Sequence, residues 1–147
     1  MQDKVVLITG ASAGIGEATA LHFADIGYRK FALVARGKEK LQELANKLRA
    51  KGATKLLLLA KDLYEPTKVC ESIINEVIAY FGRLDIFFSN AGIFFGGNTG
   101  REIQEDQLNK VMNLNFISGV YLSKYALPHL EKTKGTIIFN SGVFGKS

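Results

Sequence analysis

The stretch that decides the fold is TGASAGIG, residues 9–16, which follows directly on an apolar run at residues 5–8. Its glycines, Gly10, Gly14 and Gly16, have the spacing G-x-x-x-G-x-G and lie between a predicted buried strand and a predicted helix. Glycine at such a junction permits a tight turn, close approach of a pyrophosphate, and close packing of the helix on the strand. The alternative is a glycine-rich turn that holds no ligand.

The helix after the glycines is predicted over residues 14–26, and the strand before them over residues 4–9. Backbone N–H groups near Ser12 to Ile15 are expected to point at phosphates, helped by the positive end of the helix dipole. The apolar spacing predicts an inward face made by Ile15, Ala18, Thr19, Phe23 and Ile26.

The rest of the chain alternates apolar strands with amphipathic helices. Further strands are predicted at residues 31–35, 56–60, 84–88 and 136–139, and a loop at residues 89–100. Further helices are predicted at residues 38–50, 66–81 and 104–130, with Pro128 expected to kink or shorten the last one. Strands that are apolar on both faces and alternate with helices indicate a parallel sheet covered on both sides. We therefore expect an α/β, doubly wound, Rossmann-type sheet of five strands, forming one domain over residues 1–147.

The composition narrows the class of protein. Of 147 residues, 47% are hydrophobic and 22% charged, which is typical of a globular chain. No apolar run approaches the roughly 20 residues that span a bilayer, and the N-terminus lacks the flanks of a secretory signal, so a cytoplasmic location is expected. Cys70 is the only cysteine, which predicts no disulfide and no metal site. The net charge of +5 comes from scattered lysines and arginines, typical of solvated helix faces rather than of a nucleic-acid interface.

Four segments, in chain order, resemble motifs of the short-chain dehydrogenase/reductase family, and the resemblance runs over residues 4–146. Residues 9–16 resemble its cofactor motif. Residues 61–63 resemble the segment that contacts adenine, residues 89–92 resemble its N-A-G motif, and Asn115 resembles an active-site asparagine. The positions that the resemblance assigns to cofactor binding in these segments are Thr9, Gly10, Ser12, Gly14, Ile15, Gly16, Asp62, Leu63, Asn90, Ala91 and Gly92.

Three of these positions also allow a second interpretation. The carboxylate of Asp62 can accept from an adenine amino group, or it can cap a helix two or three residues later. Asn90 can tie strand-end backbone groups together and wall a nicotinamide-ribose pocket, or it can be a turn residue. By resemblance Asn115 distorts its helix and holds a water in a proton relay, and the alternative is an exposed asparagine.

Arg36, directly after the second predicted strand, bears on the choice of cofactor. An acid at this point usually binds a free ribose 2′-hydroxyl, whereas arginine accommodates a 2′-phosphate. No Asp or Glu occupies residues 33–38, and Lys38 and Ser12 are placed to help hold a phosphate. The sequence therefore favours NADP(H) over NAD(H). The alternative is a surface arginine paired with Glu39.

The resemblance implies hydride transfer between the nicotinamide and a carbonyl or alcohol carbon, with a Tyr-x-x-x-Lys pair that is expected beyond residue 147. Tyr64 and Lys68 have this spacing but follow the third strand, far from the nicotinamide end, and we reject them as the pair. The family's catalytic serine aligns with Gly142. Ser141 matches the serine before it and stays a candidate only if it swings in.

The favoured function is an NADP(H)-dependent oxidoreductase, of which this chain alone shows no turnover on a small-molecule substrate. The alternative from a different class is a catalytically inactive dinucleotide-binding or interaction protein. A nucleic-acid-binding domain is a distant third. The family's C-terminal strands are missing from this chain, so residues 136–139 are expected to form an apolar edge, which leaves a homo-oligomer open.

Overall fold

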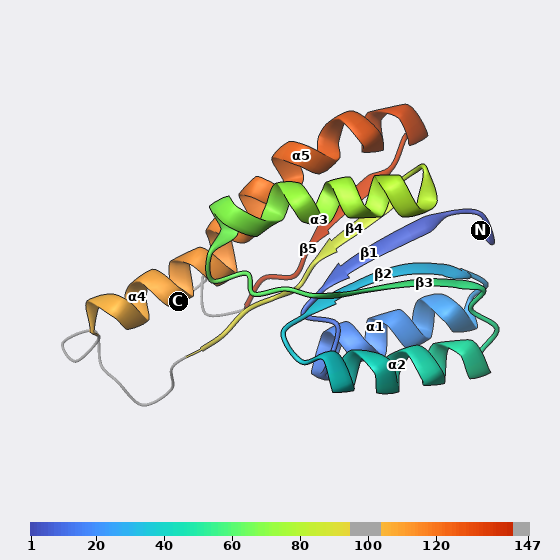
Figure 1. Ribbon diagram of the computed structural model, residues 1–147, viewed down its shortest axis with the longest axis horizontal. Coiled ribbons are helices and arrows are strands. Elements are labelled where there is room, and N and C mark those ends of the chain that lie inside the picture. The colour runs from blue at the N-terminus through green and yellow to red at the C-terminus, as the bar shows by residue number, and fades with distance from the viewer. Residues whose placement is uncertain (95–103, 143–147) are drawn as a thin grey trace.

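The computed structural model describes residues 1–94 and 104–142, and Figure 1 shows its two helical layers around one sheet. The sheet has five strands, all parallel, in the order β3-β2-β1-β4-β5. The strands are β1 (Val5–Thr9), β2 (Lys30–Ala35), β3 (Lys55–Ala60), β4 (Ile86–Ser89) and β5 (Thr136–Phe139). This confirms the doubly wound parallel sheet that the sequence predicts.

The helices cover both faces of the sheet. In chain order they are α1 (Gly14–Asp25), α2 (Lys38–Ala50), α3 (Pro66–Phe81), α4 (Glu105–Met112), the π-helical turn η1 (Asn113–Ile117) and α5 (Ser118–Thr133). Helices α1 and α2 pack on one face, whereas α3 and α5 pack on the other (Figure 1). Each helical layer therefore encloses its own hydrophobic core against the sheet.

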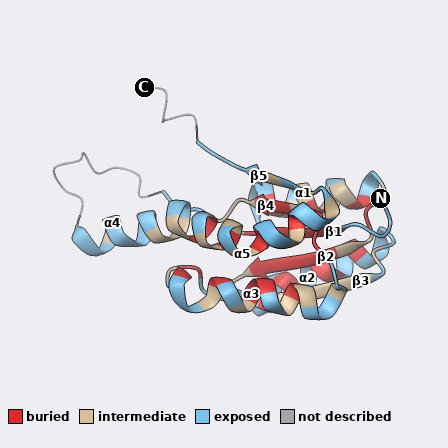
Figure 2. Cartoon of the chain, turned by 90° about the horizontal axis from the view of Figure 1, so that it is seen from above, coloured by how far each residue is buried: buried red, intermediate tan, exposed pale blue. Residues whose placement is uncertain are grey.

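The central strand and one edge strand differ in burial. All five residues of β1 are buried, because it pairs with β2 and β4 and is covered by helices on both faces. Strand β5 pairs only with β4, and its Ile138 and Phe139 are 39% and 59% exposed. Figure 2 shows this contrast along the sheet. The exposed apolar edge expected at residues 136–139 is present.

The inward face predicted for α1 is correct at Phe23, which packs against the core, and wrong at Ile15, Ala18 and Ile26. The buried residues of this helix are Gly16, Ala20 and Ala24, whereas Ile15 and Ile26 are 60% and 44% exposed. Small residues let the helix lie close to the strands, and a Cβ at Gly16 would overlap the backbone of the preceding loop. The buried face of α1 is therefore determined by the close approach of the helix to the sheet, and not by the size of its apolar side chains.

The long helix predicted over residues 104–130 is present as an unbroken helical segment, but it is not uniform. The structure divides this segment into α4, η1 and α5, and α5 continues past the exposed Pro128 to Thr133. A π-helical turn inserts an extra residue and rotates the following helix relative to the preceding one. The hydroxyl of Ser118 donates to the carbonyl of Leu114 at 2.6 Å, inside this irregular turn.

One buried carboxylate joins the amino ends of two strands. Asp85, 3% exposed, accepts from the backbone N–H of Val5 at 2.9 Å and from the guanidinium of Arg83 at 2.7 and 2.9 Å. These bonds hold β1 beside β4 at the end of the sheet opposite to the pocket described next.

Candidate functional site

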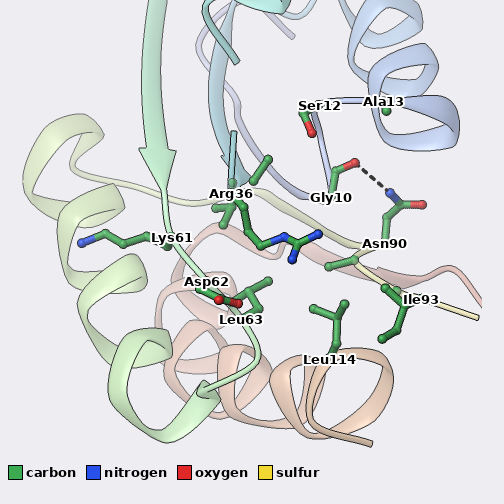
Figure 3. A pocket seen from close by; sticks show the side chains of 14 residues that line it. Gly10, Ser12, Ala13, Arg36, Lys61, Asp62, Leu63, Asn90, Ile93 and Leu114 are labelled. Atoms are coloured by element: carbon green, nitrogen blue, oxygen red, sulfur yellow. Dashed lines mark hydrogen bonds between the residues drawn. The ribbon is translucent and has the colours of Figure 1, made fainter. Parts of the chain in front are cut away.

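A pocket of about 330 Å³ opens at the carboxyl ends of the strands (Figure 3). Its walls come from the segments that follow β1, β2, β3 and β4, and from η1. The lining residues are Gly10, Ser12, Ala13, Val34, Ala35, Arg36, Lys61, Asp62, Leu63, Asn90, Ala91, Gly92, Ile93 and Leu114. Open α/β sheets bind ligands at this end of their strands.

The glycine loop after β1 lies against the segment after β4. Gly10 has a left-handed φ of +63°, and a Cβ there would lie 3.0 Å from the Cα of Ala91 and from Nδ2 of Asn90. A Cβ on Gly16 would overlap the carbonyl oxygen of Gly10 and lie 2.7 Å from Nδ2 of Asn90. Glycine is required at both positions because two backbone segments and a helix meet there.

The N-terminus of α1 keeps its hydrogen-bond donors open. Its N-cap residue, Ala13, has no side-chain oxygen and makes no capping bond. The first N–H groups of a helix have no partner within the helix and carry partial positive charge. Since Ser12 and Ala13 line the pocket, these donors stand at its wall, in an arrangement suited to phosphate oxygens.

Arg36 projects from the end of β2 into the pocket (Figure 3). The side chain is exposed, and no carboxylate of the described residues forms an ion pair with it, so the alternative pairing with Glu39 is not made. Its guanidinium carbon lies 5.1 Å from the centre of the Tyr64 ring. The pocket therefore contains a guanidinium whose N–H donors are not used by an acid.

Asp62 stabilises the turn that follows β3. One of its carboxylate oxygens accepts from the backbone N–H of Tyr64 at 2.9 Å, ahead of α3, whose N-cap is Glu65. The carboxylate therefore caps this turn and not the helix itself. Asp62 is exposed and lines the pocket, so the predicted contact with adenine is left to its second oxygen.

Asn90 joins the ends of three strands. Its Nδ2 donates to the carbonyls of Thr9 and Gly10 at 3.2 and 3.3 Å, and its Oδ1 accepts from Nδ2 of Asn140 at 2.8 Å. The hydroxyl of Thr9 in turn accepts from the N–H groups of Asn90 and Ala91. Asn90 is thus no free turn residue. Thr9, 1% exposed, lies beneath the pocket and does not line it.

Asn115 lies in η1, and its amide is hydrogen bonded although the residue is exposed. Its Oδ1 accepts from the N–H of Ile93 and its Nδ2 donates to the carbonyl of Ile93, both at 2.8 Å. The pair fixes the segment after β4 on the irregular turn. The helix is distorted at the position that the resemblance implies, whereas the water relay stays a prediction.

Ser141 and Gly142 follow β5, and both are exposed and outside the pocket lining. A Cβ on Gly142 would meet no atom within 4 Å, so a serine would fit there. Of the other predicted positions, Gly14 and Ile15 lie in the first turn of α1, outside the lining.

Reasoning from the sequence assigned no role in the site to several residues that contribute to it: Ala13, Val34, Ala35, Lys61, Ile93, Leu114 and Asn140. Lys61 and Asn140 each stand next to a residue that the sequence singled out, and this adjacency was the available signal. Ile93 and Leu114 are apolar, and nothing in their spacing separates them from core residues.

The parallel sheet, the glycine loop and the pocket at the strand ends define a Rossmann-type protein. The chain matches the family described as short chain dehydrogenase over residues 4–147, and it belongs to that family.

Similar proteins extend this assignment. The chain is 40% identical to "11-beta-hydroxysteroid dehydrogenase-like 2" of Arabidopsis thaliana over 139 residues, which are 92% of this chain and 43% of the relative. A solved metagenomic short-chain oxidoreductase in complex with NADP is 28% identical, with a TM-score of 0.92 over 100% of this chain and 66% of the other. A carveol dehydrogenase from Mycobacterium avium in complex with NAD is 23% identical, with a TM-score of 0.87 over 98% and 56%.

The chain spans about two fifths of the length of the curated relatives it matches. Within the described ranges, none of the helices combines the length and the apolar character needed to cross a membrane.

Proposed function

We propose that this chain binds a nicotinamide dinucleotide in the pocket at the strand ends, NADP(H) in preference to NAD(H). In this proposal it is the cofactor-binding part of an oxidoreductase that acts on a carbonyl or an alcohol. The bound nicotinamide supplies or accepts the hydride.

The observation that carries the proposal is the guanidinium of Arg36, which forms an ion pair with no carboxylate of the described residues, in a pocket that also borders the N-terminus of α1. Arginine binds phosphate through parallel N–H donors, and helix N-termini bind phosphate through backbone N–H groups. A dinucleotide with a 2′-phosphate carries a ligand for each of these donors: the 2′-phosphate for the arginine and the pyrophosphate for the helix N-terminus. The relatives bound to NADP and to NAD share the fold, so the preference is argued from Arg36 and not from the fold.

Different residues of this chain are proposed to bind different parts of the cofactor. Arg36 and Ser12 would hold the 2′-phosphate, and the N-terminus of α1 would hold the pyrophosphate. Asp62 and Leu63 would contact the adenine, and Asn90 would form the wall on the nicotinamide side. Asn115 holds this wall in place and is the position proposed for a proton relay.

The alternative proposal is a dinucleotide-binding protein without catalysis. The observation that favours it is glycine at position 142, where the family's serine would orient the substrate oxygen. Both proposals predict that the 147-residue chain turns over no alcohol or carbonyl, because it holds no Tyr-x-x-x-Lys at the nicotinamide end. They differ once a C-terminal segment that supplies this pair is attached.

The test is a fluorescence titration of the chain with NADPH and, separately, with NADH. We expect tighter binding of NADPH, and we expect Arg36→Ala to weaken it by about 10- to 100-fold, the range for lost charge-assisted hydrogen bonds. Arg49→Ala is the matched control, because Arg49 is exposed on α2, outside the pocket lining, and carries the same charge. Equal affinities in the unmodified chain would overturn the preference for NADP(H). A folded chain that binds neither cofactor would overturn the whole proposal.

A further inference from the structure

We propose that Tyr64 is a specificity-determining residue, whose ring supports Arg36 and thereby sets the preference for a 2′-phosphate. This rests on the proposed function and adds a second residue to it. Tyr64 belongs to the Tyr-x-x-x-Lys spacing that was rejected as a catalytic pair, so the ring acquires a role that does not involve its hydroxyl proton.

The geometry puts the guanidinium over the aromatic ring. The guanidinium carbon of Arg36 lies 5.1 Å from the centre of the Tyr64 ring, within the range of a cation–π contact. The two side chains come from different segments, one from the end of β2 and the other from the turn before α3. The contact therefore joins Arg36, which lines the pocket, to a ring that lies outside the lining, in the turn before α3.

The backbone of Tyr64 is fixed on both sides. Its N–H donates to a carboxylate oxygen of Asp62 at 2.9 Å, and its carbonyl accepts from Nδ2 of Asn113 at 3.0 Å. The first bond belongs to the turn after β3, and the second comes from η1. Because both bonds are made by backbone atoms, the ring can be changed without removing its anchors.

A ring suits this position better than an acid would. A guanidinium stacks on an aromatic ring through its face and hydrogen bonds through its edge, so both contacts can be made at once. A carboxylate partner would occupy the same N–H donors and neutralise the charge that attracts phosphate. The ring of Tyr64 limits the rotamers of Arg36, whereas the N–H donors stay available to a ligand.

Lys68, the second residue of the Tyr-x-x-x-Lys spacing, takes part in a different interaction. The ammonium of Lys68 forms an ion pair with Glu65 at 2.8 Å, on the exposed first turn of α3. The resulting expectation is specific: the aromatic ring of Tyr64 matters for cofactor preference, and its hydroxyl does not.

The test compares Tyr64→Phe, Tyr64→Leu and Arg36→Ala in titrations with NADPH and NADH. Tyr64→Phe keeps the ring and the backbone anchors, so the ratio of the two affinities is expected to stay unchanged. Tyr64→Leu is expected to lower the NADPH affinity about three- to fivefold, the worth of one cation–π contact, with less than about a twofold change for NADH. In Arg36→Ala, the added Tyr64→Leu change is expected to have no further effect on the ratio.

A second pair of ligands isolates the phosphate. Adenosine 2′,5′-bisphosphate and adenosine 5′-monophosphate differ by the 2′-phosphate, and Tyr64→Leu is expected to weaken only the bisphosphate. Thermal melting of each variant reports whether it folds, and Tyr64→Met, which also lacks a ring, replaces Tyr64→Leu if the latter does not fold.

Two results distinguish the failure of this inference from that of the function it rests on. If Arg36→Ala abolishes the preference for NADPH and Tyr64→Leu leaves it intact, the role of Tyr64 is overturned and the proposed function stands. If the unmodified chain shows no preference, the proposed assignment to NADP(H) fails. If it prefers NADPH and Arg36→Ala keeps that preference, the assignment stands, and the roles of Arg36 and Tyr64 are overturned.

Discussion

The two sides of the pocket are built by different means. On the β1–β2 side, the shape comes from backbone: Gly10 and Gly16 bring a loop, a helix and a strand end into direct contact. On the β4–β5 side, the shape comes from side-chain amides. Asn90 hydrogen bonds to the end of β1 and to Asn140, and Asn115 hydrogen bonds to the segment after β4. The strands of the two sides also differ in burial: β1 is fully buried and β5 is largely exposed.

This difference separates two kinds of sensitivity to mutation. An atom added at a contact between backbone segments causes a steric overlap, because protein interiors are close-packed and the main chain has no alternative rotamer that would relieve it. A lost hydrogen bond contributes a modest net amount, and water can replace part of it at an exposed position. Substitutions on the first side are therefore expected to act sharply, and those on the second side in graded steps.

The largest effect is expected for Gly16→Ala. The new methyl group would overlap the carbonyl oxygen of Gly10, so helix α1 has to move away from the loop. We expect the free energy of unfolding to fall by about 3 kcal/mol, the upper range for overpacking, and NADPH binding to be lost. Denaturant unfolding and a fluorescence titration measure the two effects.

Gly37→Ala is the matched control for this change. Gly37 precedes α2 with φ −84°, and the nearest atom to an added Cβ is Cβ of Lys40 at 4.0 Å. We expect its stability to stay within about 0.5 kcal/mol of the unmodified chain. Equal stability of the two variants would contradict the close contact between α1 and the glycine loop.

A smaller effect is expected for Asn90→Ala. The change removes two bonds to the carbonyls of Thr9 and Gly10 and one bond from Asn140. We expect a loss of about 2 kcal/mol in the free energy of unfolding and weaker NADPH binding. Asn140→Ala removes one of these bonds, and about 1 kcal/mol is expected for it.

Asp85→Ala separates lost stability from lost binding. Asp85 joins β1 and β4 at the amino ends of the strands, so its removal destabilises the same two strands without touching the pocket. Its folded molecules are expected to bind NADPH with unchanged affinity. An Asn90→Ala variant that behaves in the same way would show that the amide bonds serve only stability.

The fold was predictable because its signals are local. Each strand is a short apolar run, each helix has its own periodicity, and the glycines at residues 9–16 mark one junction. These signals fixed the strand positions to within a few residues, and with them the edge of the sheet where the pocket forms. The sequence predicts a doubly wound sheet of five strands but not the order of its strands, β3-β2-β1-β4-β5.

The errors arose where a local pattern was overruled by packing. Ile15 and Ile26 fit an inward helix face, but the close approach at Gly16 turns them outward. The apolar spacing after residue 104 continues through η1, and nothing in it marks the π-helical turn, where Asn113 and Asn115 hydrogen bond to distant segments.

The site was predictable in its residue types and not in its connections. Arg36 and Asn90 were identified from their places after strands, which the sequence supplies. The bond from Asn140 to Asn90 and the contact of Arg36 with Tyr64 join residues far apart in the chain. No pattern within a single segment contains such pairs.

A final effect concerns Cys70, is confined to alkaline pH, and sharpens the comparison. Its side chain is 0% exposed between α3 and α5, and its thiol contacts the carbonyl of Ser118 at 3.8 Å. Burial raises the pKa of the Cys70 thiol from 9.0 to about 12. The exposed β5 therefore borders a helical layer that is closed to water, and we expect no labelling of Cys70 by a thiol reagent at pH 8 unless the chain unfolds.

The raised pKa also gives a direction for stability against pH. Below about pH 9 the thiol is neutral in both states, and above it the unfolded chain ionises while the folded chain does not. Stability is therefore lost as the pH rises from about 9 to about 12, and at pH 10 the loss is on the order of 1 kcal/mol. Cys70→Ala removes this contribution and changes no other ionisable group, so the difference between the two unfolding curves isolates it. Fast labelling of the folded chain, or identical pH dependence of both proteins, would show that water reaches the α3–α5 layer and that the β4–β5 side is open throughout.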